Sequence, residues 1–308
     1  PNEWNLIEKN LRPEFMAQME TVLALGNGYL GMRGVHEEGR PCIQNGTFVN
    51  GFYESWPIVY GEEACGFAQT GQTMLNVTDS KIIKLFVDDE PFDLATAGIR
   101  RYARQLNLKS GTLDRDLVWE TPSGKLVRIR SRRLVSFRQR HVAAISYEVT
   151  ILDEPAPVTI SSEMLYQRPE EQTESSDPRQ ARFAGKFLYP RAGVAKDRRI
   201  VLVHATERSQ MMLACAIDHD LESKCPHSYK TDHNGNSGKV AFTIEAEPGE
   251  PIHLTKYMVY HTAKTSDAHQ ISRQAEWTLD RVTRQGFTQL LAEQEQYMEQ
   301  FWRRSDVQ

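Results

Sequence analysis

The sequence has few cysteines and no long apolar segment. Its 308 residues include four cysteines, none of them in a CxxC pair, which favours reduced thiols over a disulfide framework. No apolar run approaches the roughly 18 residues that a membrane-spanning helix needs. Residues 1–6 show neither the basic nor the apolar part of a secretion signal. We therefore expect free thiols, a cytoplasmic location and no membrane partner.

The sequence also lacks an excess of charge of either sign. Its formal net charge is -4, so it offers no basic surface for phosphates, and nucleic acid is not an expected partner. The chain exceeds the usual size of a domain, but all-β sandwiches reach about 250 residues as one domain. One large β domain with a helical appendage fits this length better than two equal domains.

Alternating apolar and polar residues dominate from residue 21 to residue 261. Turn residues at Asn27-Gly28 and at Asp88-Asp89 predict two hairpins. The polar segments 167–178 and 223–238 are predicted loops, the first of them long or disordered. Short strands at this spacing indicate a sandwich. The predicted strands are 21–25, 29–33, 81–87, 91–94, 112–119, 125–137, 141–151, 158–165, 200–204, 211–217, 239–245 and 252–261.

The periodicity becomes helical after the last predicted strand. Ser266 and Asp267 are suitable N-caps, and Gly286 divides the helical segment into two helices. We therefore expect a β domain over residues 1–265 and a helical linker over residues 266–308. The apolar stripe of these helices needs a surface to cover it, so we expect the chain to be part of a larger protein.

Two motifs match sites of known chemistry by spacing. Residues 26–31 fit the GxGxxG dinucleotide fingerprint, but that motif must join a strand to a helix, and here it lies in a predicted hairpin. Residues 225–227, with His219 and His233, include possible zinc ligands, but their spacing fits no standard zinc finger. Backbone turns and a solvated loop are the favoured interpretations, so no cofactor and no metal site is predicted.

Paired carboxylates and aromatic residues remain as candidates for sugar chemistry. Glu37-Glu38 and Glu62-Glu63 are neighbours in sequence only, and we interpret them as surface acids rather than as a two-carboxylate hydrolytic site. Aromatic rings can stack on sugars, although they more often fill a core. The aromatic cluster comprises Phe48, Phe52, Tyr53, Trp56, Tyr60 and Phe67.

Five ordered blocks of the sequence resemble one family. The chain is similar to the N-terminal domain of glycoside hydrolase family 65, whose members include disaccharide phosphorylases and some trehalose hydrolases. One departure is Cys65, where the resemblance leads us to expect an aromatic residue, so a stacking role at that point is in doubt. The matching blocks are residues 25–38, 46–53, 71–79, 104–113 and 133–137.

This resemblance implies a mainly β fold, namely a large antiparallel super-sandwich of the galactose-mutarotase-like kind. It also implies that an α-helical linker follows the super-sandwich and leads to an (α/α) six-fold catalytic barrel. It implies inverting phosphorolysis of an α-glucosyl disaccharide such as maltose, trehalose or kojibiose, with inorganic phosphate as co-substrate, and a homodimeric parent enzyme. The family's general acid and phosphate-binding residues correspond to positions after Gln308, so we assign no catalytic residue to this chain. A hydrolytic parent enzyme and a carbohydrate-binding β domain remain as alternatives.

The resemblance also raises the question of which surface meets the barrel. Glycines together with Asn, Arg and acidic residues suit close polar contacts between backbones. We therefore expect residues 26–34 and Glu37-Glu38 to face the catalytic barrel.

Overall fold

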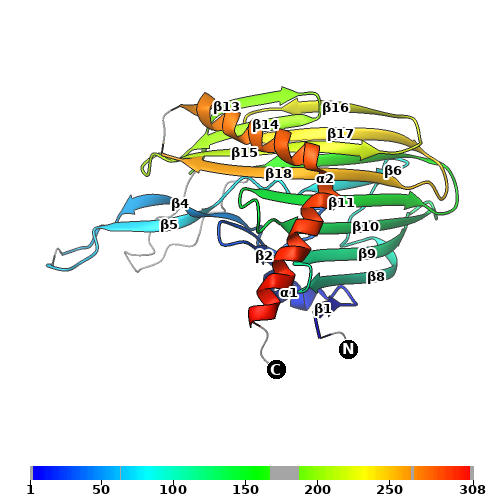
Figure 1. Ribbon diagram of the computed structural model, residues 1–308, viewed down its shortest axis with the longest axis horizontal. Coiled ribbons are helices and arrows are strands. Elements are labelled where there is room, and N and C mark those ends of the chain that lie inside the picture. The colour runs from blue at the N-terminus through cyan, green and yellow to red at the C-terminus, as the bar shows by residue number, and fades with distance from the viewer. Residues whose placement is uncertain (1–2, 63, 167–186, 265–266, 306–308) are drawn as a thin grey trace.

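The computed structural model describes residues 3–62, 64–166, 187–264 and 267–305. In this part of the chain the strands form three antiparallel sheets, which we call the large, five-stranded and four-stranded sheets. Two of them pack face to face, and the four-stranded sheet extends from one end (Figure 1). The predicted mainly β sandwich with a C-terminal helical segment is thus confirmed.

The large sheet forms one layer of the sandwich. Its nine strands are ordered β1-β8-β9-β10-β11-β18-β15-β14-β13. Their bounds are β1 (Asn5–Glu8), β8 (Gly98–Asn107), β9 (Thr112–Glu120), β10 (Leu126–Val135), β11 (Val142–Ile151), β13 (Tyr189–Lys196), β14 (Arg199–Ala205), β15 (Met212–Glu222) and β18 (Ile252–Ala263).

The two smaller sheets have different roles. The five-stranded sheet, ordered β16-β17-β12-β6-β7, covers the inner face of the large sheet, and the four-stranded sheet is ordered β2-β3-β4-β5. The strands of the five-stranded sheet are β6 (Ile83–Val87), β7 (Glu90–Pro91), β12 (Ala156–Leu165), β16 (His227–His233) and β17 (Ser237–Ala246). Those of the four-stranded sheet are β2 (Leu25–Gly26), β3 (Leu30–Met32), β4 (Thr47–Pro57) and β5 (Thr70–Asn76).

Two apolar clusters hold these layers together. The main core lies between the large and five-stranded sheets and includes the fully buried Trp119, Ile160 and Phe242. A second cluster joins the outer face of the large sheet to helix α2 (Ala268–Ser305). Burying each large apolar side chain contributes about 1.5–3 kcal/mol, so α2 is an integral layer of the fold. The remaining helical elements are η1 (Pro13–Phe15), a short 3-10 helix, and α1 (Met16–Val22).

Helix α2 agrees closely with the sequence prediction. Its first residues are capped by Asp267, whose Oδ1 accepts hydrogen bonds from the backbone N–H groups of His269 and Gln270 at 2.9 and 3.1 Å. Gly286, with φ 78° and ψ 163°, kinks the helix and divides it into two halves. Figure 1 shows the first half over β13, β14, β15 and β18 and the second half crossing β11, β10, β9 and β8 near one of their ends.

Several local predictions were wrong or incomplete. Residues 21–22 end helix α1 and are not part of a strand, so the first hairpin is confirmed only as the short pair β2 and β3. The predicted loop 223–238 contains β16. The predicted long loop 167–178 and the domain boundary at 265–266 fall on residues outside the described part of the chain. No helix of the described part is long and apolar enough to cross a membrane.

Candidate functional site

A cluster of arginines and glutamates is buried in the described part of the molecule. Arg115 donates two hydrogen bonds to the Glu38 carboxylate, at 2.7 and 2.8 Å, and lies 3.2 Å from Glu37. Arg133 donates to Glu37 Oε1 at 2.6 Å. All four side chains are buried. Burial alone would raise the pKa of Glu37, but Arg115 and Arg133 lower that pKa well below its usual value.

Two further groups bind the same segment to the large sheet. Arg104 donates to the carbonyl oxygen of Gly34 and lies 3.3 Å from His36 Nε2, and the Tyr102 hydroxyl lies 2.9 Å from the same His36 nitrogen. Burial, and then the charge of Arg104, lower the pKa of His36 well below its usual value, so this imidazole is neutral. Residues 34–39 are thus fixed by buried ionic contacts within this chain.

This arrangement corrects two sequence expectations. Glu37 and Glu38 are 3% and 6% exposed, so they are not surface acids, and they offer almost no surface for contact with another domain. They are adjacent in sequence, yet both reach Arg115. Their partners lie 77 or more residues away along the chain, and no local sequence signal identifies them. Glu63 lies outside the described residues, and Glu62 is exposed.

A projecting hairpin, residues 52–74, forms the second notable feature, and we call it the arm. Figure 1 shows the arm extending beyond the body of the sandwich. At its base the Glu54 carboxylate accepts hydrogen bonds from the backbone N–H groups of Glu207, Arg208 and Ser209 at 2.8–3.2 Å. Glu54 is buried, so a charged acceptor fastens the arm to the turn between β14 and β15.

The aromatic cluster is divided between the core and the arm. Phe52 is fully buried, and the Trp56 ring lies against Gly71, where a Cβ atom would approach that ring to 2.5 Å. Tyr60 and Phe67 contact each other near the tip of the arm, with ring centroids 4.8 Å apart. Most of these rings therefore pack against this chain, although Phe67 is exposed.

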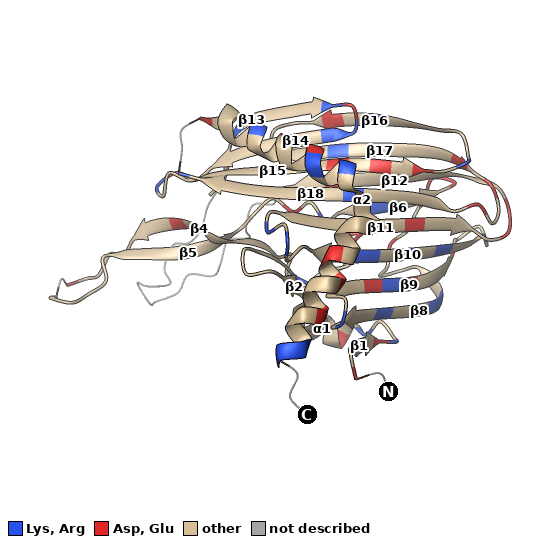
Figure 2. Ribbon diagram, viewed as in Figure 1, with Lys and Arg blue, Asp and Glu red and all other residues tan. Residues whose placement is uncertain are grey.

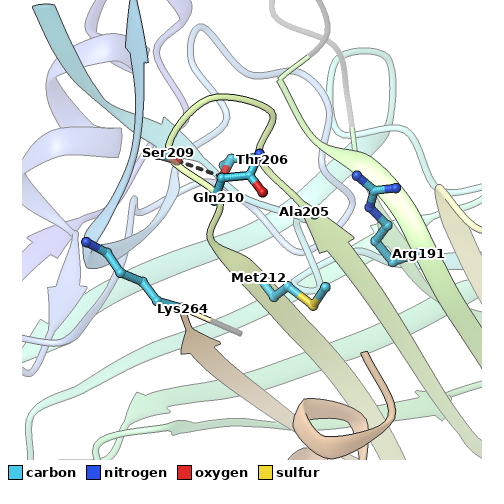
Figure 3. A pocket seen from close by; sticks show the side chains of 7 residues that line it. All are labelled: Arg191, Ala205, Thr206, Ser209, Gln210, Met212 and Lys264. Atoms are coloured by element: carbon cyan, nitrogen blue, oxygen red, sulfur yellow. Dashed lines mark hydrogen bonds between the residues drawn. The ribbon is translucent and has the colours of Figure 1, made fainter. Parts of the chain in front are cut away.

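A shallow pocket lies beside the base of the arm (Figure 3). Its two cations, Arg191 and Lys264, lie on opposite sides and point apart. The Thr206 hydroxyl donates to the carbonyl oxygen of Met211, and the Ser209 hydroxyl lies 2.6 Å from both Tyr53 O and Thr206 Oγ1. Because these hydroxyls already have partners in the chain, and no carboxylate of the described residues lines the pocket, the described lining has no groups arranged for acid–base chemistry.

A second groove, between α2 and the outer face of the large sheet, does contain carboxylates. Asp114 binds Arg132 at 2.6 Å, and Asp116 binds Arg128 at 2.8 Å. Figure 2 shows these opposite charges alternating across β8 to β11. This outer face carries paired, solvated charges, and its carboxylates are neutralised by neighbouring arginines.

Polar groups also fasten the second half of α2. The Gln294 side chain is 1% exposed and contacts three backbone groups: its Oε1 accepts from Phe137 N at 3.0 Å, and its Nε2 donates to the carbonyl oxygens of Val135 and Gly111 at 3.3 and 3.4 Å. Trp302 Nε1 donates to the carbonyl oxygen of Leu108 at 2.7 Å. Nothing in the sequence indicated that Gln294, which lies in a helix predicted from its apolar residues, would fasten α2 to the backbone of the sandwich.

The residues of the possible dinucleotide motif and of the possible zinc cluster do not form a site in the structure. Residues 26–31 span the end of β2, the turn and the start of β3, with Gly28 at φ 85°. His219 is buried and contacts Arg198 O and Ser162 Oγ, both at 2.7 Å, whereas His227 is exposed. Within the described ranges no three His, Cys, Asp or Glu residues gather as metal ligands would. All four cysteines are free, as predicted.

Comparisons with known proteins give a consistent result. Residues 6–301 match the family described as "Glycosyl hydrolase family 65, N-terminal domain". The chain is 34% identical to an alpha,alpha-trehalose phosphorylase of Thermoanaerobacter brockii over 99% of its own length and 40% of that protein. It is 35% identical to an uncharacterized glycosyl hydrolase of Mycobacterium leprae, over 99% of its own length and 38% of that protein.

A solved structure has the same fold. A putative kojibiose phosphorylase from the human microbiome matches with a TM-score of 0.83 at 18% sequence identity, over 97% of this chain and 38% of that one. The chain thus spans about two fifths of the length of the relatives that it matches.

Proposed function

Because this chain belongs to the N-terminal domains of glycosyl hydrolase family 65, we propose that it is the noncatalytic domain of an enzyme that cleaves an α-glucosyl disaccharide by inverting phosphorolysis. In this proposal the parent enzyme is a cytoplasmic homodimer, and its substrates are the disaccharide and inorganic phosphate. The curated relatives include proteins named trehalose, maltose and kojibiose phosphorylases. The general acid and the phosphate site belong to a catalytic barrel elsewhere in the parent enzyme.

One observation carries the noncatalytic assignment. Cleavage of a glycosidic bond with inversion needs a proton donor on one side of the sugar and a nucleophile on the other, with space between them. Each buried carboxylate of the described residues is instead occupied by an arginine, a lysine, a tyrosine or backbone N–H groups. These carboxylates are Glu8, Glu20, Glu37, Glu38, Glu54 and Asp79.

The layered structure supports a scaffold role. Helix α2 is packed on the large sheet along both of its halves and ends near Trp302, which is held to the backbone of Leu108. A long helix fixed in this way sets the direction in which a following segment leaves the sandwich. We propose that α2 is the linker that positions the catalytic barrel relative to the β domain.

The reaction of the full-length protein that carries this chain can be tested directly. With maltose, trehalose or kojibiose and inorganic phosphate, phosphorolysis releases β-glucose 1-phosphate, whereas hydrolysis releases two free monosaccharides from the disaccharide without consuming phosphate. We expect phosphate-dependent release of glucose 1-phosphate from one of these sugars. Phosphate-independent release of glucose would instead assign a trehalase-type hydrolase.

The alternative role, carbohydrate binding by the β domain, depends on the aromatic residues of the arm in the region of Trp56 and Tyr60. Phe67 is 49% exposed and could stack on a sugar ring. Isothermal titration of the isolated chain with maltose and with trehalose separates the two roles. We expect no binding at millimolar sugar; saturable binding that is lost in Phe67→Ala would assign a carbohydrate-binding module.

A further inference from the structure

Four asparagines of the sequence are followed by a glycine, and this is the pairing at which an asparagine most readily loses its side-chain amide. The backbone nitrogen of the next residue attacks the side-chain carbonyl carbon. Glycine favours the attack because it has no side chain in the way and the widest backbone freedom. The sequence alone does not rank the four pairs, which are Asn27-Gly28, Asn45-Gly46, Asn50-Gly51 and Asn234-Gly235.

The Asn27 side chain is held at both of its polar atoms. Its Oδ1 accepts hydrogen bonds from the backbone N–H groups of Tyr29 and Leu30, at 3.0 and 2.8 Å. Its Nδ2 donates to the carbonyl oxygens of Ser136 and Arg140, at 2.6 and 3.0 Å. All four hydrogen bonds oppose the rotation that would bring the side-chain carbon onto the next backbone nitrogen.

Two other pairs are also protected. Asn234 is exposed, but its Oδ1 accepts from the backbone N–H groups of Asn236 and Ser237 and from the Ser237 hydroxyl, at 2.9–3.2 Å. The side-chain oxygen of Asn45 is buried, and so is Gly46. Water therefore has poor access to this pair.

The remaining pair is both exposed and weakly held. Asn50 and Gly51 are exposed, and among the described residues the Asn50 side chain makes one hydrogen bond, from Nδ2 to the carbonyl oxygen of Gly28 at 3.0 Å. Gly51 lies where the pairing of β4 with β5 is irregular, between Phe48 and Tyr53. Its φ is 77°, and an added Cβ atom would meet nothing within 4 Å. The open space around Gly51 leaves room for its nitrogen and the Asn50 side chain to meet.

We propose that Asn50 is the residue at which this chain deamidates spontaneously. The Gly51 nitrogen forms a bond to Cγ of Asn50, and the bond between Cγ and Nδ2 breaks. The proton of the Gly51 N–H group leaves with Nδ2 as ammonia, and the product is a five-membered succinimide ring. Water then opens the ring at either carbonyl to give aspartate or isoaspartate, so water is the one reactant consumed.

The place of Asn50 in the fold gives this reaction a consequence. Asn50 lies in β4 just before the arm, and the same strand continues into the arm (Figure 1). An aspartate carboxylate cannot donate to the Gly28 carbonyl oxygen, so the hydrogen bond at this point is lost. Isoaspartate adds a carbon atom to the backbone of β4. We therefore expect modified chains to hold the arm less firmly.

Peptide mapping by mass spectrometry tests the site in the purified 308-residue chain. The chain is incubated at mildly alkaline pH, where the attacking nitrogen loses its proton more readily, and we expect aspartate and isoaspartate to accumulate first at Asn50. Asn27 and Asn234 should react at least about tenfold more slowly, because their hydrogen bonds must break first. In the chain unfolded in urea all four pairs should react at similar rates, since only the sequence then matters.

Limited proteolysis tests the consequence for the arm. The incubated wild-type chain and fresh Asn50→Asp should be cut in the arm faster than the fresh wild-type chain. Asn50→Gln is the control: incubation should produce no isoaspartate at this position and should not change its rate of cleavage. If Asn50→Asp is cut no faster than the wild-type chain, the arm does not depend on this residue.

Two results of the peptide mapping would overturn the proposal. One is an Asn50 that stays intact through the incubation, and the other is an Asn50 that reacts no faster than the other three asparagines in the folded chain. Neither result bears on phosphorolysis by the parent enzyme, which is measured separately.

Discussion

At the scale of single residues, Glu54 determines how the arm is attached. Three backbone N–H groups of the turn between β14 and β15 donate to its buried carboxylate. Hydrogen bonds to a charged group contribute about 1.5–3 kcal/mol each, and an unsatisfied buried donor is costly. The residue thus links a projecting element to the sandwich over more than 150 positions of sequence.

We expect Glu54→Gln to lower the free energy of unfolding by about 1–3 kcal/mol, because a neutral amide replaces the charged acceptor and turns one donor toward the N–H groups. The matched control is Glu62→Gln on the exposed part of the arm, which should change stability by less than about 0.5 kcal/mol. Urea denaturation measures both variants. Equal stability of the two would show that the three contacts do not fasten the arm.

His219 gives the domain an acid-sensitive contact. Burial lowers its pKa to about 3, with a smaller contribution from the charge of Lys256. The folded chain therefore holds this imidazole neutral, whereas the unfolded chain binds a proton below about pH 6.5. Its contribution to stability is complete above about pH 6.5 and is lost as the pH falls toward 3.

His219→Asn should consequently reduce the loss of stability between pH 6.5 and 4. The exposed His227→Asn should leave the slope unchanged. The measurement is the free energy of unfolding in urea at a series of pH values, corrected for each variant's stability at pH 7. A wild-type slope in His219→Asn would contradict this assignment.

Residue-level chemistry was the least predictable from sequence. The resemblance identified the segment around Glu37 and Glu38, but their burial depends on Arg115 and Arg133, which tertiary structure alone brings near. From the local sequence, two adjacent acids are expected at the surface, because burying a carboxylate without a partner is costly. The sequence does not show which distant residues will be those partners.

At the scale of elements, α2 shows what periodicity can and cannot reveal. The sequence predicted an apolar stripe on this helical segment, and the structure buries it from Ile271 to Val282. By contrast, the five-residue alternation over residues 21–25 was too short to distinguish a strand from the end of α1. The arm escaped prediction because its strands contain glycines and polar residues that a hydrophobic pattern does not detect.

Gln294 provides the sharpest test of how α2 is held. Gln294→Leu fits the helix but leaves the contacts to Phe137, Val135 and Gly111 unmade. We expect a loss of about 2 kcal/mol or more in the free energy of unfolding, since each buried unsatisfied group costs about 1–3 kcal/mol. Gln296→Leu, on the exposed side of the same helical turn, is the control.

Guanidinium denaturation distinguishes these two variants. Gln296→Leu should stay within about 0.5 kcal/mol of the wild-type chain, as is usual for surface substitutions. If Gln294→Leu were as stable as Gln296→Leu, apolar burial alone would hold the second half of α2, and the polar contacts would be incidental.

At the scale of the whole molecule, the pattern of short strands predicted the sandwich. Five blocks of the sequence indicated the family. The arrangement of three sheets, with an arm at one end, was not predictable, because the pairing of distant strands such as β6 with β12 has no local signal. The chain spans about two fifths of its relatives. The buried carboxylates of the described residues are engaged in contacts that hold the sandwich together, and chemistry is proposed to occur in another domain.

The direct test of this noncatalytic role is an assay of the purified 308-residue chain for glucose 1-phosphate release. The chain is incubated with inorganic phosphate and, separately, maltose, trehalose and kojibiose, beside a full-length trehalose phosphorylase as a positive control. We predict no glucose 1-phosphate and no free glucose above the level without protein, because an acid and a nucleophile must flank the scissile bond. Release of glucose 1-phosphate that depends on the concentration of the chain would contradict the account.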